Sequence, residues 1–290
     1  MPLRVLKEIR SAVANLNPEE VRSAAERPLR IALVGSNDRS IDAMEEFLLP
    51  ADHVSFQKRA DANAILYRST RAESPEQFDL VLCEEERCPK GGFTFYANDP
   101  SKTLHEILEQ RPELGIALSR NFYPFRQPVV NHVIHSVARD NALFAVITAL
   151  PDIIPSIVDL PWSIGEFASD TAFLTINQIR MAFLIAAASD KPVGYSVQKG
   201  EIASIVTGAF GWRALARELV GKVPFGVGLI PKGAIAFAGT YVAGLGLDHF
   251  HRLGYGLSRQ ERQDSYQAAY DRGKGIVELV VKSLRGRSAA

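Results

Sequence analysis

The stretch Val223-Pro-Phe-Gly-Val-Gly-Leu-Ile-Pro-Lys-Gly-Ala-Ile-Ala-Phe-Ala-Gly-Thr-Tyr-Val-Ala-Gly-Leu-Gly-Leu247 carries a single charge, on Lys232. Such a stretch must be covered by a protein core, a partner or lipid, because exposed apolar surface is unfavourable in water. It belongs to a longer block, Asn141 to Gly256, which has 16 charged residues in 116 positions. That density lies below the quarter typical of soluble domains. The block therefore predicts a domain that is buried on many sides or touches lipid.

Prolines and glycines divide this block into helices of moderate length. We expect helices over 128–150, 169–188, 201–220 and 232–250, with the most apolar one last. A bilayer-spanning helix needs about 20 apolar residues, and Pro231 and Lys232 interrupt the last helix before it reaches that length. The pattern favours a helical bundle that docks on a membrane over one that crosses it. Ser258 and Glu261 form a capping box, which begins a final amphipathic helix.

The residues before the block alternate between short apolar runs and helical segments. A helix is expected to begin after Asn17, and others to cover 40–49 and 101–110. Strands alternating with helices predict a mainly parallel sheet. The expected strands are Leu29–Val34, Val54–Gln57, Ala64–Tyr67, Phe78–Cys83, Phe93–Tyr96 and Leu114–Ser119.

The predicted fold class is therefore α/β plus all-α, with a small, mainly parallel α/β sheet domain followed by an apolar helical bundle. The expected domains are 1–27 (N-terminal helices), 28–124 (the α/β domain), 125–257 (the apolar helical domain) and 258–290 (the C-terminal amphipathic helix). This division follows the change in charge density and periodicity along the chain.

The overall charge and the cysteines limit the classes of function. Lys and Arg number 33, as do Asp and Glu, which argues against nucleic acid as the main partner. The two cysteines, Cys83 and Cys88, have no flanking Cys or His, so free thiols are expected rather than a disulfide framework or a zinc site. The first ten residues lack a long apolar run. We therefore expect a cytoplasmic location, possible also at the cytoplasmic membrane as a peripheral or integral protein.

The residues after the first strand lie where a nucleotide-binding domain would hold phosphate. They read Gly35-Ser-Asn-Asp-Arg-Ser-Ile-Asp42, so the lysine of a phosphate-binding loop is replaced by Ile41 and its metal-binding hydroxyl residue by Asp42. Gly35, Ser36 and Arg39 remain as the candidate phosphate contacts. Without the lysine the phosphate charge loses its main counter-charge. No cofactor is therefore expected, and GTP is the one alternative that stays open.

The other reactive side chains form no complete catalytic or metal-binding set. His132 and His135 share a helical face, but two ligands are too few for a metal site. His249 and His251 are expected to cap the carbonyls at the end of the apolar helix. The acidic residues after Phe78–Cys83, Glu84 among them, fit a solvated strand end. No catalytic residue and no metal ligand is therefore assigned.

Polar side chains inside the apolar block form a second candidate group. They are Asn177, Gln178, Trp212, Arg213, Arg217, Glu218 and Lys232. Buried charges must be paired or must reach water. An internal Arg–Glu network that fixes the register of the helices is the favoured interpretation; arginines reaching a membrane surface and an anion site are the alternatives.

These residues also carry a resemblance to a known family. The marks are Asn141-Ala142, Asn177-Gln178, Trp212-Arg213 with Ala216-Arg217-Glu218, and Pro231-Lys232 running into Ala238-Gly239-Thr240-Tyr241. Phe125 to Gly254 resembles the helical domain found in YcjF-like membrane proteins and behind many bacterial Era-like GTPase domains. The resemblance implies a helical, often membrane-associated module beside a GTPase-like domain, and no established reaction.

Together these features lead to a hypothesis for function. The chain is expected to be a non-catalytic, GTPase-like adaptor or scaffold, in which a degenerate phosphate-binding loop accompanies a helical domain. That domain would bind a protein partner or a membrane surface, and a homo-oligomer is possible. Two alternatives stay open: an atypical nucleotide-binding enzyme that uses Arg39 and an acid such as Glu84, and an integral membrane protein.

Overall fold

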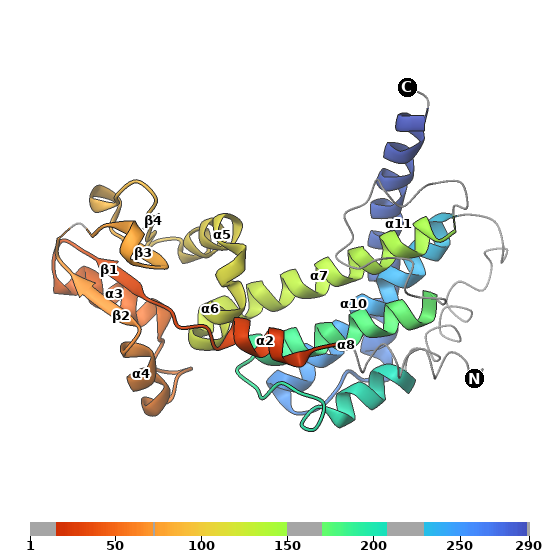
Figure 1. Ribbon diagram of the computed structural model, residues 1–290, viewed down its shortest axis with the longest axis horizontal. Coiled ribbons are helices and arrows are strands. Elements are labelled where there is room, and N and C mark those ends of the chain that lie inside the picture. Colours follow the sequence, from red (N-terminus) through yellow and green to blue (C-terminus); the bar gives the residue numbers. More distant parts are fainter. Residues whose placement is uncertain (1–15, 72, 150–169, 208–228, 289–290) are drawn as a thin grey trace. The chain divides into compact units, whose positions relative to one another are not determined.

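The computed structural model describes residues 16–71, 73–149, 170–207 and 229–288 (Figure 1). It contains a small, wholly parallel sheet and long helices, which confirms the predicted α/β plus all-α class. The contacts divide the chain into two units. The α/β unit comprises Glu20–Asn131 with Ala187–Lys191, and the helical unit comprises the other described residues.

The sheet of the α/β unit has four parallel strands in the order β2-β1-β3-β4. They are β1 (Ile31–Val34), β2 (Leu66–Ser69), β3 (Leu80–Cys83) and β4 (Phe93–Thr94). Every residue of β1 and β3 is buried. Their unbroken apolar sequences are typical of strands covered on both faces. The predicted strands at 29–34, 78–83 and 93–96 are thus confirmed in shortened form, and the one at 64–67 is confirmed with a shift of two residues toward the C-terminus.

Helices of the α/β unit follow or precede these strands. They are α2 (Pro18–Ala25), α3 (Asp38–Leu48), α4 (Phe56–Asn63), α5 (Pro100–Gln110) and α6 (Gly115–Asn121). Short 3-10 turns are η1 (Pro75–Gln77), η2 (Glu85–Arg87) and η3 (Pro112–Leu114). The Asn17 side chain accepts a hydrogen bond from the amide of Glu19, 3.0 Å away, so the predicted helix start after Asn17 is confirmed.

Two predicted strands are helical. Val54–Gln57 contains the N-cap of α4, where the Ser55 side chain accepts a hydrogen bond from the Lys58 amide. Leu114–Ser119 lies in η3 and α6. Its short apolar run fits a buried strand or a buried helix equally well. Pro112, which suits a helix start, is the signal that could have separated them.

The helical unit is formed mainly by four long helices. They are α7 (Tyr123–Ile147, which begins in the α/β unit), α8 (Asp170–Ala188), α10 (Leu229–Leu253) and α11 (Arg259–Ser288). Residues 199–207 are also helical. The predicted helices at 128–150, 169–188 and 232–250 are confirmed, whereas the end of the one predicted at 201–220 lies outside the described residues.

The helix α10 is longer than the sequence predicts. It begins at Leu229, so Pro231 and Lys232 lie in its first turn rather than before it. Proline is tolerated there because the first amides of a helix have no acceptor within the helix. By length and composition alone, Leu229–Leu253 and Thr171–Ala188 could cross a membrane, although 83% of the second is buried inside the protein.

The helices α10 and α11 form an antiparallel pair that starts at the predicted capping box. The Glu261 amide donates to Ser258 Oγ at 3.2 Å, and the Ser258 amide donates to Glu261 Oε2 at 2.8 Å. A side chain at Gly273 would lie 3.2 Å from the backbone of Ala234, so glycine permits this close approach. The shared core lies between α7, α10 and α11, and it includes Ala142, Phe237 and Tyr266 among its members.

Candidate functional site

The strand order reverses at the carboxyl ends of β1 and β3. The chain passes from β1 to β2 on one side and then returns to β3 on the other side of β1. Ligands of open α/β sheets bind at such a switch point. Gly35 and Ser36 follow β1, and Glu84 follows β3, so the predicted loop lies at this switch point.

A side chain of the protein itself pairs with the loop at this switch point. The Ser36 amide donates a hydrogen bond of 2.7 Å to Glu84 Oε2. The Ser36 hydroxyl and amide, with smaller contributions from Ser40 and Arg87, hold the pKa of Glu84 below its ordinary value. The ionised carboxylate therefore accepts the hydrogen bond that the Ser36 amide would otherwise donate to a phosphate oxygen.

Neighbouring donors of the loop are also paired within the chain. Asn37 is the N-cap of α3: its Oδ1 accepts from the Ser40 amide at 3.1 Å, and Ser40 Oγ donates to the Asn37 carbonyl at 2.9 Å. A side chain at Gly35 would lie 2.3 Å from Ser40 Oγ. The glycine is therefore required by the tight turn into α3, and the amides of Ser36, Asn37 and Ser40 in this turn are paired within the chain.

The charges around the loop do not favour an anion. Arg39, the predicted phosphate contact, is exposed and points to no partner that the structure records. Arg68 binds the carboxylates of Asp42 and Glu45, each at 2.6 Å. An entering phosphate would have to displace the Glu84 carboxylate from the Ser36 amide. Arg39 is the only cationic residue of the Gly35–Asp42 loop sequence. Gly35, Ser36 and Arg39 thus lie in one turn, and the hydrogen bonds recorded for this turn are made to other residues of the chain.

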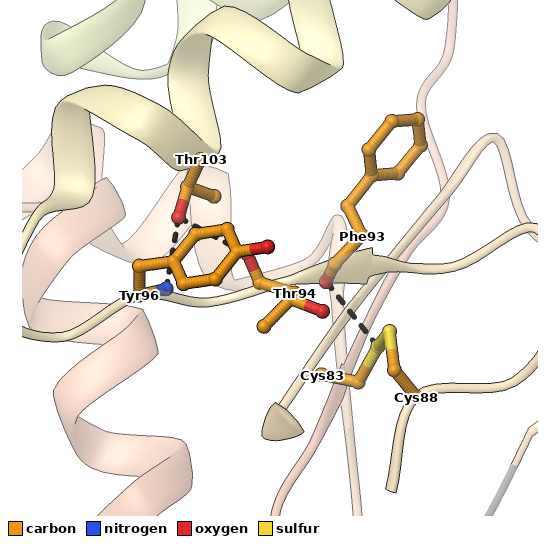
Figure 2. The surroundings of a disulfide bond; sticks show 6 residues. All are labelled: Cys83, Cys88, Phe93, Thr94, Tyr96 and Thr103. Carbon is orange, nitrogen blue, oxygen red and sulfur yellow. Dashed lines mark hydrogen bonds between the residues drawn. A yellow bond between two sulfur atoms is a disulfide. The ribbon is translucent and has the colours of Figure 1, made fainter. Parts of the chain in front are cut away.

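A disulfide is formed directly at the end of β3 (Figure 2). Cys83, the last residue of β3, is bonded to Cys88, with the Cα atoms 5.1 Å apart. The prediction of free thiols is therefore wrong. It rested on the number of cysteines, whereas the turn at η2 brings their Cα atoms within the range that a disulfide needs. Disulfides are rare in the cytosol, so this bond does not favour the expected cytoplasmic location.

The segment beyond the disulfide is held by β4 and α5. Cys83 Sγ lies 3.2 Å from the Phe93 carbonyl oxygen. Thr103 Oγ1 of α5 accepts from the Tyr96 amide at 3.0 Å and donates to the Thr94 carbonyl at 3.1 Å. Glu84 is thus followed by a fixed turn, which keeps its carboxylate near Ser36.

Removing the charge of Glu84 should weaken the α/β unit at neutral pH. We expect Glu84→Gln to lower its free energy of unfolding by about 1 kcal/mol, near the low end for charged hydrogen bonds because water reaches the pair. A lowered folded-state pKa contributes stability above the unfolded pKa of about 4.3. This contribution is lost as pH falls through the lowered value.

Urea unfolding at pH 7 and at pH 3 measures the effect. Glu86→Gln is the matched control, because Glu86 is exposed on the same turn. The two variants should differ at pH 7 and agree at pH 3. A Glu84→Gln deficit that stays the same at pH 3 would show that the charge is not its source.

The second candidate group contains a buried polar network that joins three helices. Asn141 of α7 donates from Nδ2 to Thr240 Oγ1 of α10 at 2.8 Å, and its Oδ1 accepts from Asn177 of α8 at 2.8 Å. Gln178 Nε2 donates to the same Thr240 oxygen at 3.1 Å. All four side chains are buried. Asn177 and Gln178 therefore face inward, whereas the charged residues of the predicted Arg–Glu network, Arg213, Arg217 and Glu218, lie outside the described residues.

The remaining predicted residues contribute less to a site. Lys232 Nζ donates to Thr148 Oγ1 at 3.3 Å, which links α10 to α7. Trp212, Arg213, Arg217 and Glu218 lie outside the described residues.

The histidines make contacts that the sequence did not predict. Arg272 donates to His135 Nε2 at 3.0 Å, and burial, Arg272 and His132 lower the pKa of His135. His249 Nδ1 lies 2.9 Å from the Tyr255 carbonyl, beyond the end of α10. In the part of the chain that the structure describes, no three His, Cys, Asp or Glu side chains gather as metal ligands.

Comparison of the chain with family models, curated proteins and solved structures finds no match to any of them.

Proposed function

We propose that this protein is a non-catalytic, GTPase-like adaptor or scaffold. The observation that carries the proposal is the Glu84 carboxylate on the Ser36 amide, at the place where a nucleotide phosphate would bind. The pairing of Asn37 with Ser40 adds to it, because these groups need no ligand. The α/β unit then serves as a structural or protein-binding domain. The alternative, an atypical enzyme built on Arg39 and Glu84, is disfavoured because the Glu84 carboxylate is engaged by the Ser36 amide.

Nucleotide titration tests the proposal. Calorimetric titration of the full chain with GTP and Mg²⁺ should give no saturable heat up to about 1 mM, the weak end of the affinity scale. Glu84→Gln should not create binding by itself, because the loop still lacks its lysine. Magnesium-dependent binding in the micromolar range would overturn the adaptor proposal in favour of the enzyme.

The helical unit would carry the contact with a partner protein or a membrane surface. A peripheral association is supported over insertion by the helix α11, which packs along α10 and has a charged outer face. Arg272 lies over the ring of Tyr241, near the middle of α10. If α10 crossed a bilayer, α11 would bring Asp271, Arg272 and Lys274 into the hydrocarbon, which is costly.

Membrane fractionation separates the two modes. We expect the full-length protein to be released from membranes by alkaline carbonate or high salt without detergent. Retention until detergent is added would support the integral alternative.

A further inference from the structure

The helical unit contains a cavity of about 540 Å³ that the adaptor proposal does not use. It lies among the helix over residues 199–207, α10 and the start of α11. This volume is within the range of small-molecule sites, which are mostly apolar with a few fixed polar groups. The apolar walls include Val197, Ile205, Val242, Leu247, Phe250 and Leu257.

One acidic side chain in the wall is held in a fixed position. Gln198 donates from Nε2 to Glu201 Oε2 at 2.8 Å. The same Gln198 nitrogen donates to the Ala182 carbonyl at 3.2 Å, and Gln198 Oε1 accepts from the Gly194 amide at 3.2 Å. Gln198 is only 2% exposed. The carboxylate is therefore oriented by a buried amide and presents its charge to an apolar cavity.

A buried histidine lies next to this carboxylate without a complete hydrogen bond. The His251 side chain is 5% exposed, and its Nε2 lies 3.5 Å from Glu201 Oε2. This nitrogen has no hydrogen-bond partner among the described residues. A buried polar atom left unpaired is costly. Glu201 thus lines the cavity, and the His251 side chain behind it is not fully satisfied by the described chain.

The only other charge on the described wall belongs to Arg262. It is exposed on the first turn of α11, where its Nε donates to the Ser258 carbonyl at 3.4 Å. Salt and water screen an exposed charge more than a half-buried one. Glu201, whose side chain is 14% exposed, therefore dominates the potential inside the cavity.

We propose that this cavity binds a small amphipathic cation. An aliphatic or aromatic body would lie between α10 and the helix over residues 199–207, and an ammonium group would donate to the Glu201 carboxylate. This proposal does not rest on the adaptor function, because every lining residue belongs to the helical unit.

Three probes of equal length, n-octylammonium, n-octanol and octanoate, test the choice of charge. In calorimetric titrations of the full chain, octylammonium should bind at least tenfold tighter than octanol, as expected for a hydrogen bond to a charged group. Octanoate should bind weakest. Heptylammonium should bind about fourfold more weakly than octylammonium, because one methylene fewer is buried.

Matched variants locate the binding site. Glu201→Gln should remove the preference for octylammonium over octanol, whereas Asp264→Asn, an exposed charge change on α11, should keep it. Gly246→Leu should abolish binding of all probes, because position 246 lines the cavity and has open space around it. Gly275→Leu on α11 has equally open surroundings outside the cavity and should have no effect.

Each result decides for or against the proposal. Octanoate binding tighter than octylammonium would overturn it and assign the cavity to anions at Arg262. Equal binding of octylammonium and octanol, a preference that survives Glu201→Gln, or no binding of any probe would also overturn it. Circular dichroism of each variant checks that the fold is intact.

Discussion

Gly244→Leu is expected to lower the free energy of unfolding of the helical unit by about 3 kcal/mol, at the upper end of overpacking effects. Gly244 lies on the face of α10 that meets α7 and α8. A Cβ atom there would lie 2.7 and 2.9 Å from two side-chain carbons of Ile134, and 3.1 Å from Met181 Sδ. Both neighbours are buried, so they cannot turn away into solvent. The helices would have to move apart.

Gly246→Leu is the matched control two residues away on the same helix. A Cβ at position 246 meets nothing within 4 Å. Replacing a helical glycine there should stabilise α10 by up to about 1 kcal/mol, because glycine is the weakest helix former after proline. The opposite signs of the two variants identify close packing as the cause. Urea unfolding monitored by circular dichroism measures both, and an equal loss in both would contradict this account.

The glycines of α10 show which features of helix packing can be predicted from the sequence and which cannot. The scarcity of charge in this run predicted a helix that is covered on many sides, and α10 packs against α7 and α11 in a shared core. The sequence could not tell the tightly packed Gly244 from the open Gly246. Both lie in the same apolar run, and only the positions of α7, α8 and the helix over residues 199–207 separate their roles.

The predictions that failed in the α/β unit, two of the strands and the free thiols, have a common physical origin. Val54–Gln57 and Leu114–Ser119 are short, and over such lengths an apolar strand and a buried helix have similar patterns. Ser55 and Pro112 are the local signals in the sequence that mark helix starts at these two places. Cys83 and Cys88 were judged by number, whereas their pairing depends on the turn at η2 between them.

The sequence predicted the position of the loop after β1, but not that Glu84 pairs with its Ser36 amide. A buried strand followed by Gly35 predicted the loop, and the absent lysine predicted weak phosphate binding. The hydrogen bond from the Ser36 amide to Glu84 depends on β3 lying next to β1, which the sequence does not specify. An acidic residue directly after a buried strand was the one available signal.

Asn141→Ala is expected to lower the free energy of unfolding of the helical unit by about 3 kcal/mol, comparable to the glycine variant. The Asn141 side chain is fully buried and makes hydrogen bonds to Asn177, Thr240 and the Leu174 carbonyl. Its removal leaves a cavity and deprives the Asn177 amide of its acceptor. Thr175→Val is the control, because it deletes a buried hydrogen bond made only within α8, to the Thr171 carbonyl. It should cost about 1 kcal/mol.

A double-mutant cycle then tests whether the residues act as one network. Asn177→Ala in the Asn141→Ala background should cost at least about 1 kcal/mol less than in the parent, since its partner is already absent. Strict additivity would contradict the network. Asn141, Asn177, Gln178 and Thr240 are also among the residues that carry the resemblance to the helical family. A measured coupling would therefore give that sequence pattern a physical reason: it sets the register of α7, α8 and α10, independently of any ligand or membrane.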